Sequence, residues 1–189
     1  MGPTMDGRAV RWKRHNDDRR KRIVDAAIGL IETDGVNVSL QAIGQAAGLS
    51  RSVVYRHFAE TGRSPEPDEM ARLAGIDVAG VLASYRSLCA QRLLFLEENG
   101  ASIRMAPPFS GVPTQHRVEV DGVEYFANCA WDALGVPAAL RKPGLVRSRC
   151  EQSREPLELA VGLDGPPPST WLFHCLVPAA RWWDDLVFT

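Results

Sequence analysis

Apolar residues recur with a helical period in the first third of the chain. Between residues 22 and 31 they fall at intervals of three and four: Ile23, Ala26, Ala27, Leu30 and Ile31. Such spacing draws one stripe along a helix. Asp34-Gly35 ends the pattern, because glycine accepts the left-handed backbone that often follows a helix. The pattern predicts a first helix over residues 22–31.

Two shorter helices are predicted after this one. Ser39 is placed to cap a helix that runs to Ala46, and its buried face would hold Leu40, Ile43, Ala46 and Ala47. Gly48-Leu49-Ser50 then forms a tight turn. We expect Ser50 to cap a third helix over residues 51–58 by accepting a backbone N–H bond. Val53, Val54 and Phe58 would pack inward.

The pattern changes after residue 58. Residues 61–67 are rich in glycine and proline and predict a linker. A short helix is expected over residues 66–73, and a second stripe predicts another: Val78, Val81, Leu82, Tyr85, Leu88 and Cys89. Residues 93–96 and 102–105 flank Asn99-Gly100, which predicts a hairpin. Two helices and a hairpin suggest a small winged-helix unit, whose two glutamates favour packing or substrate gating over DNA contact.

Alternating residues dominate the rest of the chain. Val118, Val120, Val123, Tyr125 and Phe126 flank Asp121-Gly122 and predict another hairpin. A helix is expected over residues 128–134, which places Cys129 and Asp132 on one face at i and i+3. Further expectations are strands at 146–149, 157–161 and 171–177, a proline loop at 166–168 and a last helix at 178–185. The predicted fold class is α+β: a three-helix helix-turn-helix bundle, then a winged-helix-like unit and a mixed strand/helix domain.

Composition places the 189-residue chain among soluble globular proteins, with 45% hydrophobic and 24% charged residues. No apolar run approaches a membrane span and the N-terminus lacks a secretory signal, so a cytoplasmic protein without a membrane partner is expected. The net charge is −1, but residues 1–22 hold eight basic and three acidic residues. This basic arm is either a contact for DNA phosphates or a solvated tail.

The N-terminal pattern carries a family resemblance. Residues 17–58, and above all SLQAIGQAAGLSRSVVYRHF, resemble the DNA-binding domain of tetracycline-repressor-type (TetR) regulators. The resemblance implies double-stranded DNA as partner, with these candidate contacts: Ser50, Arg51, Ser52, Tyr55, Arg56 and His57. Arg51 and Ser52 would reach base edges or phosphates, and the last three the DNA backbone. The alternative is a packing unit that has lost DNA contact. Such modules normally bind as dimers, so a homodimer is a candidate assembly, although the usual dimerisation domain is absent.

The second half carries another resemblance. The stretches PTQHRVEVDG, YFANCAWDALGVPAAL, VRSRCEQSREPLELAV and LVPAARWWDDLVFT resemble the organomercurial (alkylmercury) lyases, over about residues 66–189. The resemblance implies that the Cys129 thiolate captures mercury(II), a soft cation, and that Asp132 relays the proton that replaces mercury on carbon. Mercury(II) or an organomercurial is then ligand or substrate, and no resident cofactor is expected.

The resemblance departs at the second metal-binding cysteine, which the family carries just after a stretch like WWDDLVFT, where this chain ends at Thr189. Either the protein is truncated there, or another thiol substitutes. Cys175 is the candidate, with core packing as the alternative, and Cys150 matches a structural cysteine. His116 and His174 are expected to be polar or packing residues, and three tryptophans to be core aromatics: Trp171, Trp182 and Trp183.

The expected domains are a basic arm with helix-turn-helix (1–60), a linker (61–67), a winged-helix-like unit (68–106) and a lyase-like domain (107–189). One functional hypothesis is a transcriptional regulator whose lyase-like domain binds or senses mercurials or another thiophilic ligand. A second is an alkylmercury lyase that cleaves carbon–mercury bonds with Cys129 and Asp132 and carries an appended DNA-binding module. A third is a protein that binds neither DNA nor mercurials.

Overall fold

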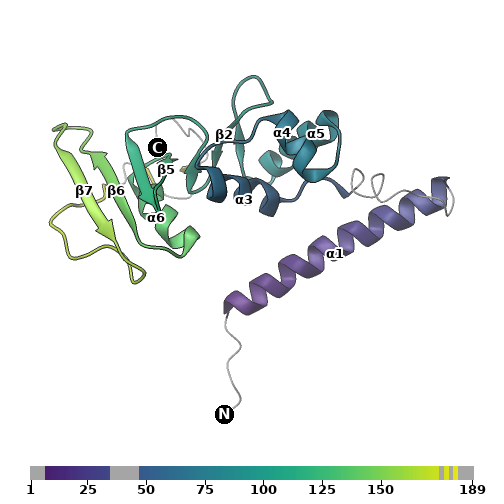
Figure 1. Ribbon diagram of the computed structural model, residues 1–189, viewed down its shortest axis with the longest axis horizontal. Helices are drawn as coiled ribbons and strands as arrows, with labels where there is room; N and C mark the ends of the chain where they lie inside the picture. The colour runs from purple at the N-terminus through teal and green to yellow at the C-terminus, as the bar shows by residue number, and fades with distance from the viewer. Residues whose placement is uncertain (1–6, 35–46, 175–176, 179–180, 183–189) are drawn as a thin grey trace, which may run out of the picture. The chain divides into compact units, whose positions relative to one another are not determined.

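The computed structural model describes residues 7–34, 47–174, 177–178 and 181–182. Within them the chain divides into two compact units, Met1–Val112 and Pro113–Thr189. Helices and strands occur together, so the predicted α+β class is confirmed (Figure 1). The first unit contains α1 (Gly7–Asp34), α3 (Arg51–Thr61), α4 (Pro67–Ala74), α5 (Val78–Ala90), β1 (Phe95–Leu96), β2 (Ile103–Ala106) and β3 (Phe109–Ser110). The second contains β4 (His116–Val120), β5 (Val123–Ala127), α6 (Ala130–Leu140), β6 (Gly144–Arg149) and β7 (Pro156–Val161).

The first helix is longer than its apolar stripe. α1 spans 28 residues from Gly7 to Asp34, so most of the predicted basic arm is helical. Arginine and lysine are good helix formers, although a charged segment shows no apolar stripe by which the helix could be recognised. The apolar side chains Ile23 and Ile31 are 42% and 43% exposed. The helix predicted from Ser39 to Ala46 lies outside the described residues.

The third predicted helix is present, and it continues three residues further, to Thr61. Ser50 stands at its N-cap position, but the predicted side-chain cap is wrong. The Ser50 hydroxyl pairs with that of Ser52 at 2.8 Å, and the Val53 N–H bonds to the carbonyl of Ser50 at 3.0 Å. The serine pair therefore replaces the usual bond from the cap to the helix backbone.

α3 packs into the first unit together with the elements that follow it. Val54 and Phe58 are fully buried, and the Phe58 ring stacks on that of Phe109 with centroids 5.5 Å apart. The turn before α3 is held as well, because the Leu49 N–H donates to the Ser84 hydroxyl of α5 at 2.8 Å. α3, which the sequence assigns to the N-terminal helix-turn-helix bundle, thus packs as a core helix of the winged-helix-like unit.

Residues 61–67 form a short, fixed connection rather than a linker between compact units. Pro65 is fully buried, and Gly62 ends α3 in a left-handed conformation (φ 73°). Arg63 forms two 2.9 Å hydrogen bonds with the Glu69 carboxylate of α4. The structure places the division between units after Val112 instead.

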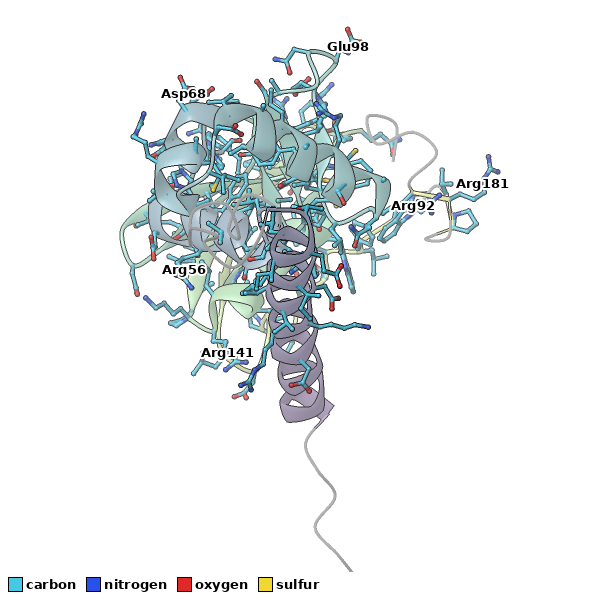
Figure 2. All side chains as sticks on the ribbon, turned by 90° about the vertical axis from the view of Figure 1, so that its right-hand side faces the viewer. Arg56, Asp68, Arg92, Glu98, Arg141 and Arg181 are labelled. Carbon is cyan, nitrogen blue, oxygen red and sulfur yellow. The ribbon has the colours of Figure 1, made fainter. Side chains whose placement is uncertain are left out.

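The hairpin of β1 and β2 is present as predicted, with Leu96 opposite Ile103. Its turn differs from the expected two-residue turn, because only Gly100 of the Asn99-Gly100 pair has a positive φ (65°). The side-chain Oδ1 atom of Asn99 accepts the backbone N–H groups of residues 101 and 102 and closes a longer loop. Glu98 lies at the tip (Figure 2).

The second unit is built on an antiparallel sheet in the order β5-β4-β6-β7. The predicted β4–β5 hairpin turns at Asp121 (φ 51°) and Gly122 (φ 78°), both left-handed as a tight turn requires. α6 buries Val136 and Pro137 and contacts β4, β5 and β6. Gly144 permits this approach, since a Cβ there would lie 3.0 Å from the Pro137 ring.

The C-terminal expectations fail in part. Residues 171–174 and 177 form no strand, so the strand predicted over 171–177 is wrong in the described residues. Trp171 is 37% exposed and is not a core aromatic, whereas Trp182 is half-buried and donates its ring N–H to Val177 O at 2.9 Å. Of the predicted last helix, the described part shows one turn at Arg181. No single described helix is long and apolar enough to cross a membrane; α4 and α5, bent by 101°, pass that test only as a pair.

Candidate functional site

Cys129 lies where β5 passes into α6. Its backbone is extended (φ −145°, ψ 177°), and it occupies the N-cap position of α6 rather than lying inside the helix. The backbone N–H of Asp132 points to the Cys129 sulfur at 3.5 Å. The first N–H groups of a helix have no acceptor within the helix, so a side chain at this position can receive them. The local fold thus brings Cys129 and Asp132 together.

The two groups alter each other's acidity. Burial raises the pKa of the Cys129 thiol from 9.0 to about 11, the Asp132 carboxylate adds to the rise, and the N–H groups of Asp132 and Trp131 oppose it. Burial also raises the pKa of Asp132 from 3.8 to about 6, against the lowering effect of its hydrogen bond with Cys129. At neutral pH the sulfur keeps its proton, and the neighbouring carboxylate is largely ionised and able to accept it.

Two residues that the sequence did not single out support this site. The Thr114 hydroxyl donates to the carbonyl of Ala127 at 2.6 Å and holds the end of β5, two residues before Cys129. Trp131 supplies an N–H group to the sulfur, while its ring, 55% exposed, lies 5.7 Å from that of Phe173. Thr114 stands in a loop 15 residues from Cys129, so no local pattern links the two.

Among the described residues, no group of three or more histidine, cysteine or acidic side chains could hold a metal ion. The site therefore offers one sulfur and one carboxyl group. Thiolate sulfur is the ligand that soft cations prefer, whereas a hard cation needs several oxygens. The candidate second thiol, Cys175, lies outside the described residues.

Cys150 and His116 have local partners of their own. The Cys150 sulfur accepts the Ser153 N–H at 3.5 Å, and hydrogen bonds with Ser153 lower the pKa of the thiol. The Nδ1 atom of His116 lies 2.8 Å from the Ser148 hydroxyl, and burial lowers the pKa of this histidine. These are the contacts of turn and packing residues, and His174 is exposed.

The candidate DNA-binding residues of α3 divide by exposure. Arg51 and Arg56 are exposed, and Arg56 points away from the helix (Figure 2). Ser52 is half-buried, and Ser50 is buried. The Tyr55 hydroxyl donates to the carbonyl of Leu93 at 3.1 Å, within the unit. Of the candidate DNA-binding residues, the two arginines are therefore the most accessible to a DNA molecule.

His57 does not lie on the outer face of α3. It is 5% exposed, and its Nε2 atom lies 3.7 Å from the Glu69 carboxylate without a hydrogen-bond partner among the described residues. Burial lowers its pKa more than Glu69 raises it. The expectation that His57 reaches the DNA backbone is not met here, because the helix turns this side chain into the unit.

Comparison with known proteins finds similarity to two families, each in a different part of the chain. Residues 23–60 match the sequence model of the bacterial regulatory proteins of the tetR family, and residues 109–189 match that of the alkylmercury lyases. An uncharacterised HTH-type transcriptional regulator of Mycobacterium tuberculosis is 38% identical over 55 residues, which cover 29% of this chain and 24% of the relative.

The lyase relatives cover more of the chain. The alkylmercury lyase of Bacillus cereus is 29% identical over 120 residues, 62% of this chain and 53% of the relative. That of Streptomyces lividans is 37% identical over 71 residues, 36% and 33% of the two chains. A solved structure described as the mercury-bound form of MerB2 shares the fold, with a TM-score of 0.50 and 23% identity over 69% of this chain and 65% of that one. The chain thus spans about a quarter of the regulator and about half of the Bacillus lyase.

Proposed function

We propose that this chain, which joins a tetR-type segment to an alkylmercury-lyase-like domain, is a DNA-binding regulator that responds to mercurials or another thiophilic ligand. The observation that carries the proposal is the pairing of Cys129 with Asp132 at the start of α6. This pairing gives one domain a soft-metal ligand, while α3 presents Arg51 and Arg56 for DNA.

Ligand capture follows from the acidity of the pair. A thiol whose pKa is raised to about 11 is almost wholly protonated at neutral pH, which limits its reaction with weak electrophiles. Mercury(II) binds sulfur strongly enough to displace that proton, and the Asp132 carboxylate is placed to receive it. The N–H groups of Trp131 and Asp132 then stabilise the sulfur in its metal-bound, anionic form.

DNA binding would rest on charge. Arg51 begins α3, Arg56 lies on its exposed face, and α1 carries the basic segment that precedes the helix-turn-helix. Arginine is suited to phosphates and to guanine because its planar group donates two parallel hydrogen bonds. We expect affinity to fall steeply with salt, since each neutralised phosphate releases counterions.

The test measures both activities on the full chain. Fluorescence anisotropy on a fragment upstream of the chain's own gene is followed with and without phenylmercury(II), for the wild type, Cys129→Ser and the matched control Cys89→Ser. We expect salt-sensitive binding, a change in DNA affinity with phenylmercury and loss of that change only in Cys129→Ser. If the protein fails to bind the DNA at every salt concentration tested, the regulator proposal is refuted.

The second candidate function is carbon–mercury protonolysis. The observation that favours it is the carboxyl group of Asp132, whose pKa of about 6 lets it take up and return a proton near neutral pH. In this reaction the carbon–mercury bond breaks and a sulfur–mercury bond forms at Cys129, while the thiol proton passes through Asp132 to the carbon. Release of benzene from phenylmercury, lost in both Cys129→Ser and Asp132→Asn, would establish the lyase.

A further inference from the structure

The N-terminus of α3 holds its exposed arginine against an aromatic ring. The guanidinium carbon of Arg51 lies 4.3 Å from the centroid of the Tyr55 ring, one helical turn further along. This distance is well inside the roughly 6 Å range of cation–π attraction. Among the described residues Arg51 forms no ion pair with a carboxylate, so this ring is the contact that orients its charge.

Tyr55 is itself fixed from two sides. Its hydroxyl donates to the carbonyl of Leu93 at 3.1 Å, and its ring meets that of Phe109 edge-on, with centroids 6.3 Å apart. Phe109 is in turn stacked on the buried Phe58. The ring beneath Arg51 is therefore part of the packed unit, and its orientation is set by residues 38 and 54 positions further along the chain.

We infer that Tyr55 is a positioning residue, which holds the Arg51 guanidinium ready for a DNA base or phosphate and does not itself bind the DNA backbone. This inference rests on the proposed DNA-binding function and changes the role that the sequence pattern suggested for Tyr55. The Tyr55 hydroxyl already donates its proton to the carbonyl of Leu93, so it has no second proton to donate to a phosphate oxygen.

The benefit of such an arrangement is entropic. A free arginine side chain loses rotamer entropy when it is ordered. A guanidinium that is already ordered on Tyr55 loses less of this entropy when DNA binds, so affinity rises without any added contact.

The test compares four variants of the full chain in DNA anisotropy titrations at several salt concentrations: Arg51→Ala, Tyr55→Phe, Tyr55→Leu and the double variant Arg51→Ala/Tyr55→Leu. Tyr55→Phe keeps the ring, so we expect a change of threefold or less in Kd. Tyr55→Leu should weaken binding about fivefold, and the double variant should bind no more weakly than Arg51→Ala. Arg56→Ala provides the matched control, whose effect should add to that of Tyr55→Leu.

Three outcomes would overturn the inference: a Tyr55→Phe defect as large as that of Arg51→Ala with a salt slope reduced by about one, an unchanged Kd in Tyr55→Leu, or additive effects of Arg51→Ala and Tyr55→Leu. The first would make the hydroxyl a phosphate ligand. Wild-type protein that binds no DNA would instead remove the proposed function and this inference together.

A measurement without DNA keeps the inference testable if Tyr55→Leu does not fold. In the free wild-type protein, the Arg51 side-chain N–H resonance should be shifted upfield by the Tyr55 ring current, and Arg51→Ala identifies the signal. An Arg51 resonance at its random-coil position would show that the ring does not hold the guanidinium, and would overturn the inference. The Arg56 resonance serves as the internal reference for an exposed arginine.

Discussion

Replacing Asp132 by asparagine should make the Cys129 thiol more acidic. The carboxylate raises the pKa of Cys129 through its negative charge and its hydrogen bond, in addition to the larger effect of burial. At an effective dielectric constant of about 20, a unit charge within a few ångströms contributes on the order of a few kcal/mol, or roughly one to two pKa units. Because burial remains in Asp132→Asn, we expect the pKa to fall from about 11 by one to two units.

The assay is alkylation by iodoacetamide as a function of pH, with each cysteine peptide followed by mass spectrometry. Only the thiolate reacts, so a fall of one unit raises the thiolate fraction of Cys129 about tenfold at any pH well below the pKa. The alkylation rate rises by roughly three- to fourfold, because a less basic thiolate is a weaker nucleophile. Rates at Cys89 and Cys150 should stay unchanged and provide internal references. Asp164→Asn, which removes an exposed carboxylate of the same unit, is the matched control.

A Cys129 pKa that stays at its wild-type value in Asp132→Asn would refute this reasoning. It would mean that burial alone sets the acidity of the thiol and that the carboxylate does not interact with the sulfur. A fall of the same size in Asp164→Asn would refute it differently, because the effect would then be one of net charge.

Three further predictions concern stability. The folded-state pKa of Asp132 is about 6, against an ordinary 3.8, so the protonated carboxyl group contributes fully to the free energy of unfolding below pH 4. This contribution, at most about 3 kcal/mol, is lost as the pH rises through 6. Urea unfolding at pH 4, 5, 6 and 7 should show the loss in the wild type but not in Asp132→Asn. Phe58→Ala removes a fully buried ring and should cost about 3–5 kcal/mol in urea unfolding of the full chain, whereas Arg56→Ala at an exposed position should cost under about 0.5 kcal/mol. Gly111→Ala would place a Cβ 1.9 Å from the carbonyl oxygen of Ile103 and should lower the melting temperature by several degrees, while Gly100→Ala, where a Cβ meets open space, should cost only the backbone strain of its positive φ.

Short-range patterns predicted most of the elements. The β4–β5 hairpin follows from alternating residues around Asp121-Gly122, and α5 follows from a stripe of apolar residues; both depend on neighbours a few positions apart. The contact of Cys129 with Asp132 was predictable for the same reason, since it lies within one helical turn. The raised pKa values of Cys129 and Asp132 could not be predicted in this way, because burial by the rest of the domain is their largest cause.

Long-range packing explains what the sequence did not show. Tyr55 and His57 fit a DNA-binding pattern, but Leu93, Phe109 and Glu69 from later segments determine where these side chains point. One signal was present: Tyr55 and Phe58 are aromatic and three positions apart, the spacing of one helix face. Likewise, the sequence favoured a strand over 171–177, yet the described residues offer no partner strand there, and Leu172 is 89% exposed.

α3 both packs in the core of its unit and presents the candidate DNA-binding arginines. These two roles together restrict how a regulator of this kind could respond to a ligand. Moving the whole helix would unpack Phe58 and Val54, both fully buried, and truncating one such aromatic alone costs about 3–5 kcal/mol. Releasing Arg51 from Tyr55 disrupts one exposed cation–π contact, which contributes about 0.5–1 kcal/mol. Typical coupling between two sites is only 1–3 kcal/mol, which is enough to change the Arg51 contact but not to unpack the helix. A ligand-dependent change in DNA affinity is therefore better sought in the side chains on α3, or in the association of two chains, than in a displacement of α3 itself.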